Sequence, residues 1–285
     1  MANEKVKIRL QGHEKFTVRE GWINKALIEL PGKPDLFTRK DSTDILGIGS
    51  NMVKSLRYWM KVFGLTNATG SELSDLGRIV AEHDPYLEKD FTLWLLHSRI
   101  AKNKENATSW YMYFNQCDAD ELDKTEITGI IQREIRKYAG NQTFSEKSVA
   151  NDVDAILNMY GKDKEKTDPE DKSVSPFARL ALVRKIEGRY IKNKPNKKSL
   201  AEMIVLFELV EKLSEAESIS IDQVIWGENG LAKIYNLSGV MANEYFDRLD
   251  AEGYIRVDRT AGLDMIYLLR HVPPMQIIED YYINN

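Results

Sequence analysis

The chain has 285 residues, of which 42% are hydrophobic and 29% charged, a balance typical of soluble globular proteins. No apolar run approaches the roughly 20 residues that cross a bilayer, and the N-terminus has no apolar signal segment, so we expect a cytoplasmic protein. The single cysteine, Cys117, excludes an internal disulfide framework and a cysteine-rich zinc site.

The net charge of −4 is unevenly distributed along the chain. Residues 1–66 contain 12 Lys and Arg against 7 Asp and Glu, a net charge of +5, whereas the remainder contains 28 against 37, a net charge of −9. This asymmetry indicates one basic interaction surface on an otherwise acidic protein.

The first candidate site lies near the N-terminus, in the stretch QGHEKF. His13 and Glu14 form the best polar pair of the chain, and a histidine with carboxylates could hold Mg²⁺ or Mn²⁺ for phosphodiester hydrolysis. Their spacing does not demand this chemistry, because the sequence has no H-E-x-x-H and no G-x-S-x-G motif. We therefore keep His13 and Glu14 as catalytic candidates and leave the metal unassigned.

A helix-turn-helix is predicted next. A helix over residues 21–30 is followed by a short helix from Asp41, a tight turn at residues 47–49 and a helix that starts at Ser50. In the last helix Lys54, Arg57 and Lys61 recur at i, i+3 and i+7, so they share one face opposite the apolar stripe. A phosphate-binding loop is a poor alternative, because the turn supplies only G-x-G with no preceding strand.

The second helix of such a motif enters the major groove of double-stranded DNA with its N-terminal residues at the base edges. We expect contacts from this helix at the bases and, further along it, at the phosphates. The expected contact residues are Ser50, Asn51, Lys54, Arg57, Tyr58 and Lys61. The alternative is a solvated basic face on a structural helix. Residues 64–77 are predicted to form a short hairpin, a wing.

A second basic stretch runs from Arg179 to Lys198, with eight cations and one acid. Its alternating pattern predicts a hairpin or loop that contacts phosphates through Arg184, Lys185, Arg189 and Lys192, and a solvated loop is the alternative of equal weight. The stretch before it, GKDKEKTDPEDKSVS, has almost no apolar residues and is predicted to be a linker or mobile loop.

Two further segments have helix-turn-helix or winged-helix outlines with acidic second helices. One spans residues 124–160 and the other residues 219–270, where strand, helices and a hairpin that turns at residues 260–262 are expected. Phosphate would repel both acidic helices, so we interpret these segments as structural or protein-binding modules.

We therefore predict a mainly α fold, with helix-turn-helix or winged-helix-like units in series and small β-hairpin wings. The expected divisions are a basic helix-turn-helix unit at 1–70, a helical middle unit at 71–161, a linker at 162–178 and a C-terminal winged-helix-like α/β unit at 179–285.

Seven ordered stretches of the chain resemble one bacterial family, the domain-of-unknown-function 4007 family. They are QGHEKFTVREGWINKAL, LGIGSNMVKSLRYWMKVFGLT, LSDLGRIVAEHDPYLEKDFTLWLLHSRIA, ATSWYMYFN, SEKSVANDVDAILNMY, SPFARLALV and RTAGLDMIYLL. Members of this family are similar to the SspB component of single-strand DNA phosphorothioate modification systems, which act in defence against phage.

The resemblance implies a DNA-binding protein that nicks DNA beside a cysteine desulfurase, a PAPS-reductase-like protein and an ATPase. The family carries no nuclease signature that could be transferred to this chain, and Lys15 stands where the family pattern has threonine. Enzymatic activity, as a metal-dependent DNA nickase, is therefore left open. The alternatives are a non-catalytic DNA-binding or transcription-regulator protein, and a protein-interaction scaffold of the modification complex.

Overall fold

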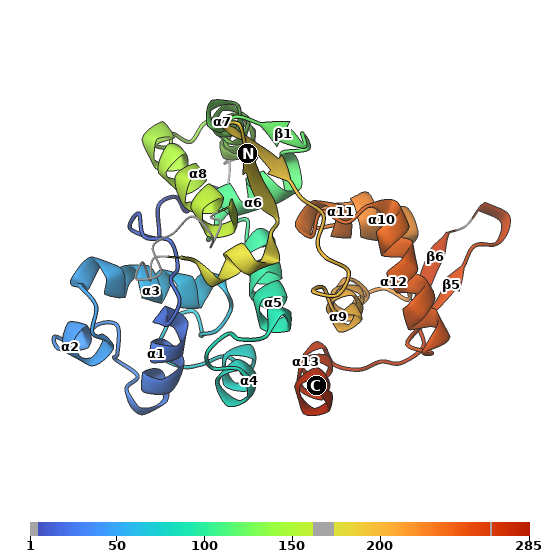
Figure 1. Cartoon of the computed structure of the whole chain (residues 1–285), viewed down its shortest axis with the longest axis horizontal. Helices are drawn as coiled ribbons and strands as arrows, with labels where there is room; N and C mark the ends of the chain where they lie inside the picture. Colours follow the sequence, from blue (N-terminus) through green and yellow to red (C-terminus); the bar gives the residue numbers. More distant parts are fainter. Residues whose placement is uncertain (1–4, 162–173, 263) are drawn as a thin grey trace. The chain divides into compact units, whose positions relative to one another are not determined.

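The computed structural model describes residues 5–161, 174–262 and 264–285, and it divides into two compact units, unit 1 at Met1–Asn193 and unit 2 at Lys194–Asn285. Both units are built mainly from helices with small antiparallel sheets (Figure 1), which confirms the mainly α prediction. Among the described residues, no helix is both long and apolar enough to span a membrane.

Unit 1 begins with an extended N-terminal segment and a set of short helices. The helices of this unit are α1 (Trp22–Glu29), α2 (Ser42–Leu46), α3 (Ser50–Val62), α4 (Asp75–His83), α5 (Asp90–Ala101), α6 (Thr108–Gln116), α7 (Lys124–Ala139) and α8 (Glu146–Gly161), with 3₁₀ turns η1 (Leu30–Gly32) and η3 (Pro176–Leu180). The predicted helices of residues 21–63 are thus present.

A tight turn joins α2 to α3. Gly47 ends α2 with φ of 61°, a left-handed conformation that a glycine adopts without strain, and Gly49 immediately precedes the first residue of α3. The segment predicted to be a wing after α3 forms one isolated antiparallel bridge, between Thr66 and Leu73, and not a pair of strands.

Aromatic side chains form the core of unit 1. Trp59 on α3, Trp94 on α5 and Trp110 on α6 are fully buried, as are Tyr111 and Phe114. Burying several large aromatic rings together supplies most of the hydrophobic stabilisation that a helical unit of this size needs. Helix α3 therefore packs through most of its surface and leaves a narrow exposed stripe.

The predicted basic hairpin is present as β2 (Val183–Ile186) and β3 (Arg189–Lys192). Glu187 and Gly188 connect the two strands, both with positive φ, the backbone of a two-residue hairpin turn. Strand β1 (Glu121–Leu122) adds to the other edge of β3, so the sheet order is β1-β3-β2.

Unit 2 follows the predicted order of strand, helices and hairpin after its first helix. Its elements are α9 (Glu202–Lys212), β4 (Ser218–Ser220), α10 (Ile221–Trp226), α11 (Leu231–Ile234), α12 (Gly239–Ala251), β5 (Ile255–Asp258), η4 (Thr260–Gly262), β6 (Met265–Leu268) and α13 (Pro274–Asn284). The three strands form one antiparallel sheet in the order β4-β6-β5.

The division into two units differs from the four ranges expected from the sequence. The ranges 1–70 and 71–161 both lie in unit 1, and so does the hairpin that was expected to open the C-terminal unit. Most of the expected linker, residues 162–173, lies outside the described residues. The hairpin belongs to unit 1 because β3 pairs with β1, which follows α6.

Candidate functional site

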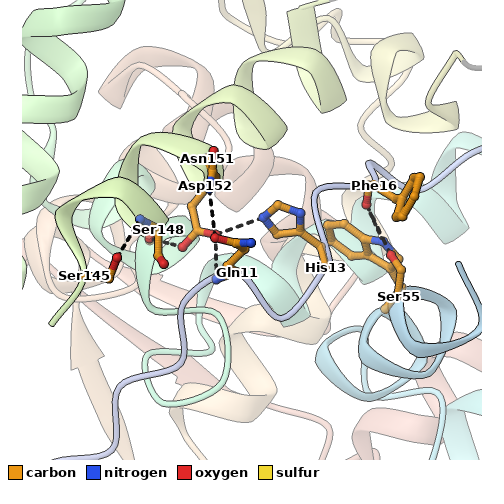
Figure 2. A network of polar contacts seen from close by, with 10 residues as sticks. Gln11, His13, Phe16, Ser55, Ser145, Ser148, Asn151 and Asp152 are labelled. Carbon is orange, nitrogen blue, oxygen red and sulfur yellow. Dashed lines mark hydrogen bonds and ion pairs between the residues drawn. The ribbon is translucent and has the colours of Figure 1, made fainter. Parts of the chain in front are cut away.

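A buried carboxylate fixes the N-terminal segment to α8 (Figure 2). Asp152 accepts a hydrogen bond from the Gln11 backbone N–H at 2.8 Å, and its Oδ1 lies 2.9 Å from His13 Nε2. The hydroxyl of Ser109 on α6 donates to the other oxygen at 2.6 Å, and Asn151 donates to the Gln11 side chain at 2.8 Å. The contacts of Gln11 and His13 join residues about 140 positions apart, so tertiary structure alone sets the position of the segment.

The ring of His13 lies in the aromatic core. Its side chain is fully buried, with the ring centroid 6.0 Å from that of Trp59 and 5.6 Å from that of Trp110. Its Nδ1 has no hydrogen-bond partner among the described residues. Glu14, by contrast, is exposed. The structure therefore does not bring the two predicted catalytic residues together as a pair that could act on one substrate group.

Five cations converge on a pocket of unit 1 with a volume of about 510 Å³. Lys7 and Arg9 come from the N-terminal segment, and Lys54, Arg57 and Lys61 from α3. The remaining lining residues are Gly12, Glu14, Phe37, Tyr58, Val62 and Asn106. We call this site the cationic pocket; Glu14 is its single acidic lining residue.

The helical pattern of α3 explains half of the cationic pocket. Val53, Leu56 and Met60 are buried against the core, which turns the cations spaced at i, i+3 and i+7 toward solvent. The close approach of the N-terminal segment explains the other half. A Cβ atom on Gly12 would lie 2.4 Å from two ring carbons of Tyr58, so only glycine allows the segment to lie against α3 at this point.

The cations of the pocket repel one another. The pKa of Lys61 is lowered by burial and by the charges of Arg57, Lys7 and Arg9. Three of the five have partners. Lys7 lies 3.6 Å from Glu105 in an exposed pair, Arg57 donates to the Thr69 carbonyl at 2.7 Å, and Lys54 donates to the Asn51 side chain at 3.5 Å. A bound anion would relieve this repulsion, so the electrostatics favour phosphate or another anion.

Tyr58 occupies a different position from the one expected. It was predicted near the DNA phosphates on the helix surface, whereas its side chain is only 9% exposed and lines the cationic pocket from within. Burial and the charge of Asp152 raise its pKa, and the charge of Arg9 opposes them. Its hydroxyl makes no hydrogen bond to another described residue. Ser50 and Asn51 are exposed at the start of α3, outside the pocket lining.

The cations of the β2–β3 hairpin do not line the cationic pocket. Arg189 pairs with Glu121 at 2.9 Å, and Lys192 donates to the backbone carbonyls of Tyr113 and Cys117, so these two side chains hold the sheet against its neighbours. The hairpin thus exposes two cations on β2, Arg184 and Lys185, the second of which lies 5.4 Å from the centre of the Tyr190 ring.

The described residues contain no ready-made cluster of ligands for Mg²⁺. They contain no group of three or more His, Cys, Asp and Glu side chains that could hold a metal ion. The best-placed carboxylate, Asp152, already accepts hydrogen bonds at both oxygens and is buried beside His13. Mg²⁺ requires several oxygen ligands and keeps some of its water, which this dry, satisfied cluster cannot provide.

Lys7 and Arg9 were not among the candidates named from the sequence. The stretch KVKIRL alternates cations at positions 5, 7 and 9 with apolar residues, the period of an extended segment with one charged face. This alternation indicates an extended segment with a basic face. It gives no information on its partner, because the pairing with α3 depends on Gly12 and Asp152.

The comparisons with known proteins bear on the fold. A family model described as "Protein of unknown function (DUF4007)" matches residues 10–282. A magnesium-ion-bound crystal structure of SspB superposes with a TM-score of 0.86 at 23% identity, and a second SspB crystal structure with a TM-score of 0.84 at 23% identity. Each covers 99% of this chain and 90% of the SspB chain. None of the curated proteins compared with the chain matches it in sequence.

Proposed function

The chain belongs to the DUF4007 family, and on this premise we propose that it is the DNA-binding subunit of a bacterial DNA phosphorothioate-modification system that acts in anti-phage defence. The fold shared with SspB, a component of such a system, supports the membership. The observation that carries DNA binding is the cationic pocket, where five cations from two segments face one side of α3.

Charge and shape together favour a nucleic acid. Lys and Arg side chains that neutralise backbone phosphates release condensed counterions, and this release supplies most of the affinity of sequence-independent DNA binding. Five converging cations are suited to a polyanion. In this proposal Lys54 and Lys61 contact phosphates of one DNA strand, and the N-terminal segment adds the charges of Lys7 and Arg9.

In this proposal the start of α3, after the α2–turn–α3 connection, faces the base edges of the DNA. Ser50 and Asn51 are exposed at this end, and a helix N-terminus with short polar side chains is the part of a helix-turn-helix that reads bases. Because the rest of α3 is buried, only its exposed stripe can meet DNA. Arg184 and Lys185 of the β2–β3 hairpin are further candidate phosphate contacts in this proposal.

The test compares two single charge reversals. We expect Lys61→Glu to weaken binding to a short DNA duplex by about tenfold and to reduce the slope of log affinity against log salt by about one, because one phosphate contact is lost. Lys147→Glu makes the same change on α8, outside the cationic pocket, and should leave the affinity near that of the wild type. Fluorescence anisotropy over a salt series measures both. Equal losses in the two variants would contradict a role for the pocket.

Nicking is a separate prediction from DNA binding. It is tested by incubating the protein with supercoiled plasmid in Mg²⁺, Mn²⁺ or EDTA, beside a Glu14→Gln variant. Open circles that require metal and that Glu14→Gln fails to produce would support a nickase with Glu14 at its centre. Salt-sensitive DNA binding without open circles would favour the alternative, a non-catalytic DNA-binding protein or transcription regulator.

A second candidate function, protein docking, is favoured by an apolar pair on unit 2. Trp226 is 54% exposed and Val240 is 72% exposed, and the Trp226 ring lies against Gly239 at the start of α12. An acidic unit that exposes apolar side chains suits a protein partner better than DNA. The partners proposed for it are the cysteine desulfurase, the PAPS-reductase-like protein and the ATPase of the same system. Trp226→Ala should then weaken co-purification of one such partner while DNA affinity is unchanged.

A further inference from the structure

We propose that the cationic pocket receives one unpaired nucleotide of the bound DNA, with its phosphate at the cations and its base at the remaining lining residues. The proposal rests on the proposed function, because it concerns DNA at the same site. It goes further in naming the group that enters the pocket and the type of base that fits it.

The first argument is the depth of the site. An exposed row of cations is enough to contact the backbone of paired DNA, so a hollow between the cations has room for a further group. The cationic pocket has a volume of about 510 Å³, within the roughly 300–1,000 Å³ typical of small-molecule sites and ample for one nucleotide. Its cations come from the N-terminal segment on one side and α3 on the other, so a phosphate between them is approached by both.

The second argument is the presence of two aromatic residues in the pocket lining, which a bound phosphate alone would not need. Phe37 and Tyr58 offer aromatic rings in a pocket otherwise rich in charge, and aromatic rings are the usual stacking partners of unpaired bases. Tyr58 is nine-tenths buried, and its hydroxyl makes no hydrogen bond to another described residue although the side chain lines the pocket. The hydroxyl is not among the buried polar atoms that lack a partner, so it is open to solvent in the pocket and is available to a ligand group.

The third argument is the acid among the cations. Glu14 would weaken the binding of a phosphate placed next to it, yet it lines the same pocket and makes no ion pair with the described residues. A carboxylate accepts hydrogen bonds from the exocyclic amino group of cytosine. Asn106 lies in the same lining, and its side-chain oxygen can accept a hydrogen bond while its nitrogen donates to Asn103 at 3.1 Å. Both acceptors favour a base that carries an amino group.

A nucleotide reaches such a pocket when it is single-stranded or when it leaves the base stack of a duplex. Enzymes and binding proteins that act on single nucleotides extrude them in this way and hold the base by stacking and by hydrogen bonds to its Watson–Crick edge. The geometry of the cationic pocket therefore assigns a preference for DNA with an unpaired cytidine over fully paired DNA and over DNA with an unpaired thymidine.

The experiment measures the affinity of the full chain for three short DNAs of otherwise identical sequence. One is fully paired, one has a single unpaired cytidine, and one has a single unpaired thymidine. We expect the cytidine DNA to bind at least about fivefold more tightly than the paired DNA, the lower end of what stacking one base on aromatic side chains contributes. The thymidine DNA should lie between them.

Two variants locate the effect. Phe37→Ala should reduce the affinity ratio of each unpaired DNA to the paired DNA, and Glu14→Gln should reduce the affinity ratio of the cytidine DNA to the thymidine DNA. Each ratio is taken within one variant, so a change in overall DNA affinity cancels. Lys147→Glu, outside the pocket, is the control that should keep every preference. Far-ultraviolet circular dichroism checks that each variant is folded. Should Phe37→Ala fail to fold, Glu14→Gln on an exposed residue still gives the answer.

The outcomes separate the two proposals. Equal affinity for all three DNAs overturns the nucleotide pocket and leaves DNA binding in place. A preference for unpaired DNA that both variants retain also overturns the pocket, because flexible DNA alone would then explain it. Absence of binding to any of the three DNAs overturns the proposed function itself.

Discussion

At Gly12 the chain passes too close to another residue to carry a side chain. The ring of Tyr58 occupies the space that a Cβ atom would need, and the two residues on either side, Gln11 and His13, are both held by Asp152. The segment therefore cannot move away to make room without breaking buried hydrogen bonds. Local sequence shows only a glycine in a basic stretch, because its steric role depends on a residue 46 positions away.

The first residue-scale prediction concerns this contact. We expect Gly12→Ala to lower the free energy of unfolding by about 1–3 kcal/mol, the usual cost of overpacking a filled interior, and to weaken DNA binding because Lys7 and Arg9 are displaced. Gly32→Ala is the matched control, since a Cβ there meets no atom within 4 Å. Urea unfolding and anisotropy measure the two effects. A Gly12→Ala protein as stable as the control would contradict the close packing.

The second residue-scale prediction concerns pH. Because burial and the neighbouring cations lower the pKa of Lys61, its charge is lost at a lower pH than that of an ordinary lysine. A phosphate favours the charged form, so DNA binding raises this pKa and takes up a proton. Affinity should therefore be full below the pKa of the free protein and fall as the pH rises through it. Lys61→Arg, which stays charged, should move this fall in DNA affinity to higher pH. If the plots of affinity against pH for the wild type and the variant superimpose, Lys61 does not contact the DNA phosphate.

At the scale of single elements, the helices were predictable where one periodic stripe decides the packing. The apolar spacing of Val53, Leu56 and Met60 predicted α3, and the alternation around β2 and β3 predicted the hairpin. The predicted wing after α3 is reduced to one bridge, between Thr66 and Leu73. In its turn the backbone N–H groups of Gly70 and Ser71 donate to the side-chain oxygen of Asn67. One backbone hydrogen bond lies on each side of the bridge, from Asn67 to Glu72 and from Ser74 to Leu65, so the hairpin is too short to form two strands.

The element-scale prediction compares two glycines in helical surroundings. Gly47 ends α2 with φ of 61°, so Gly47→Ala should destabilise unit 1 by about 1–2 kcal/mol. Gly129 lies within α7 and a Cβ there meets nothing within 4 Å, so Gly129→Ala should stabilise by about 0.5–1 kcal/mol. Thermal unfolding followed by circular dichroism shows whether each substitution raises or lowers the stability. Stabilisation by Gly47→Ala would show that this turn is not left-handed.

At the scale of the whole molecule, charge follows the division into two units. Unit 2 contains 9 Lys and Arg against 15 Asp and Glu, a net charge of −6, and unit 1 contains the remaining 31 against 29, a net charge of +2. Charge counting along the sequence therefore predicted which part would carry a basic surface. It could not predict the boundary, because unit 1 closes through the pairing of β1 with β3, which joins residues about 70 positions apart.

The candidate site was predicted only in part for the same reason. The α3 cations follow from helical periodicity, whereas Lys7 and Arg9 join them through the contacts of Asp152 and Gly12. The same contacts explain why His13, named as a catalytic candidate from its neighbour in sequence, is buried away from Glu14. Residues 11–15 form a turn in which Glu14 has a φ of 49°, so the two neighbouring side chains face opposite environments. The pairing of neighbours in the sequence does not reveal such a turn.

The anchoring of the N-terminal segment by Asp152 has a consequence for the time at which the protein becomes functional. A ribosome delivers the chain from its N-terminus, so Lys7, Arg9 and α3 emerge long before α8, whose carboxylate holds the segment in place. A nascent or truncated chain that ends before Asp152 therefore contains all five cations of the pocket but lacks the carboxylate that holds the N-terminal segment beside α3. Assembly of the anion site is thus among the last events in the folding of unit 1, and incomplete products of translation should compete poorly with the finished protein for DNA.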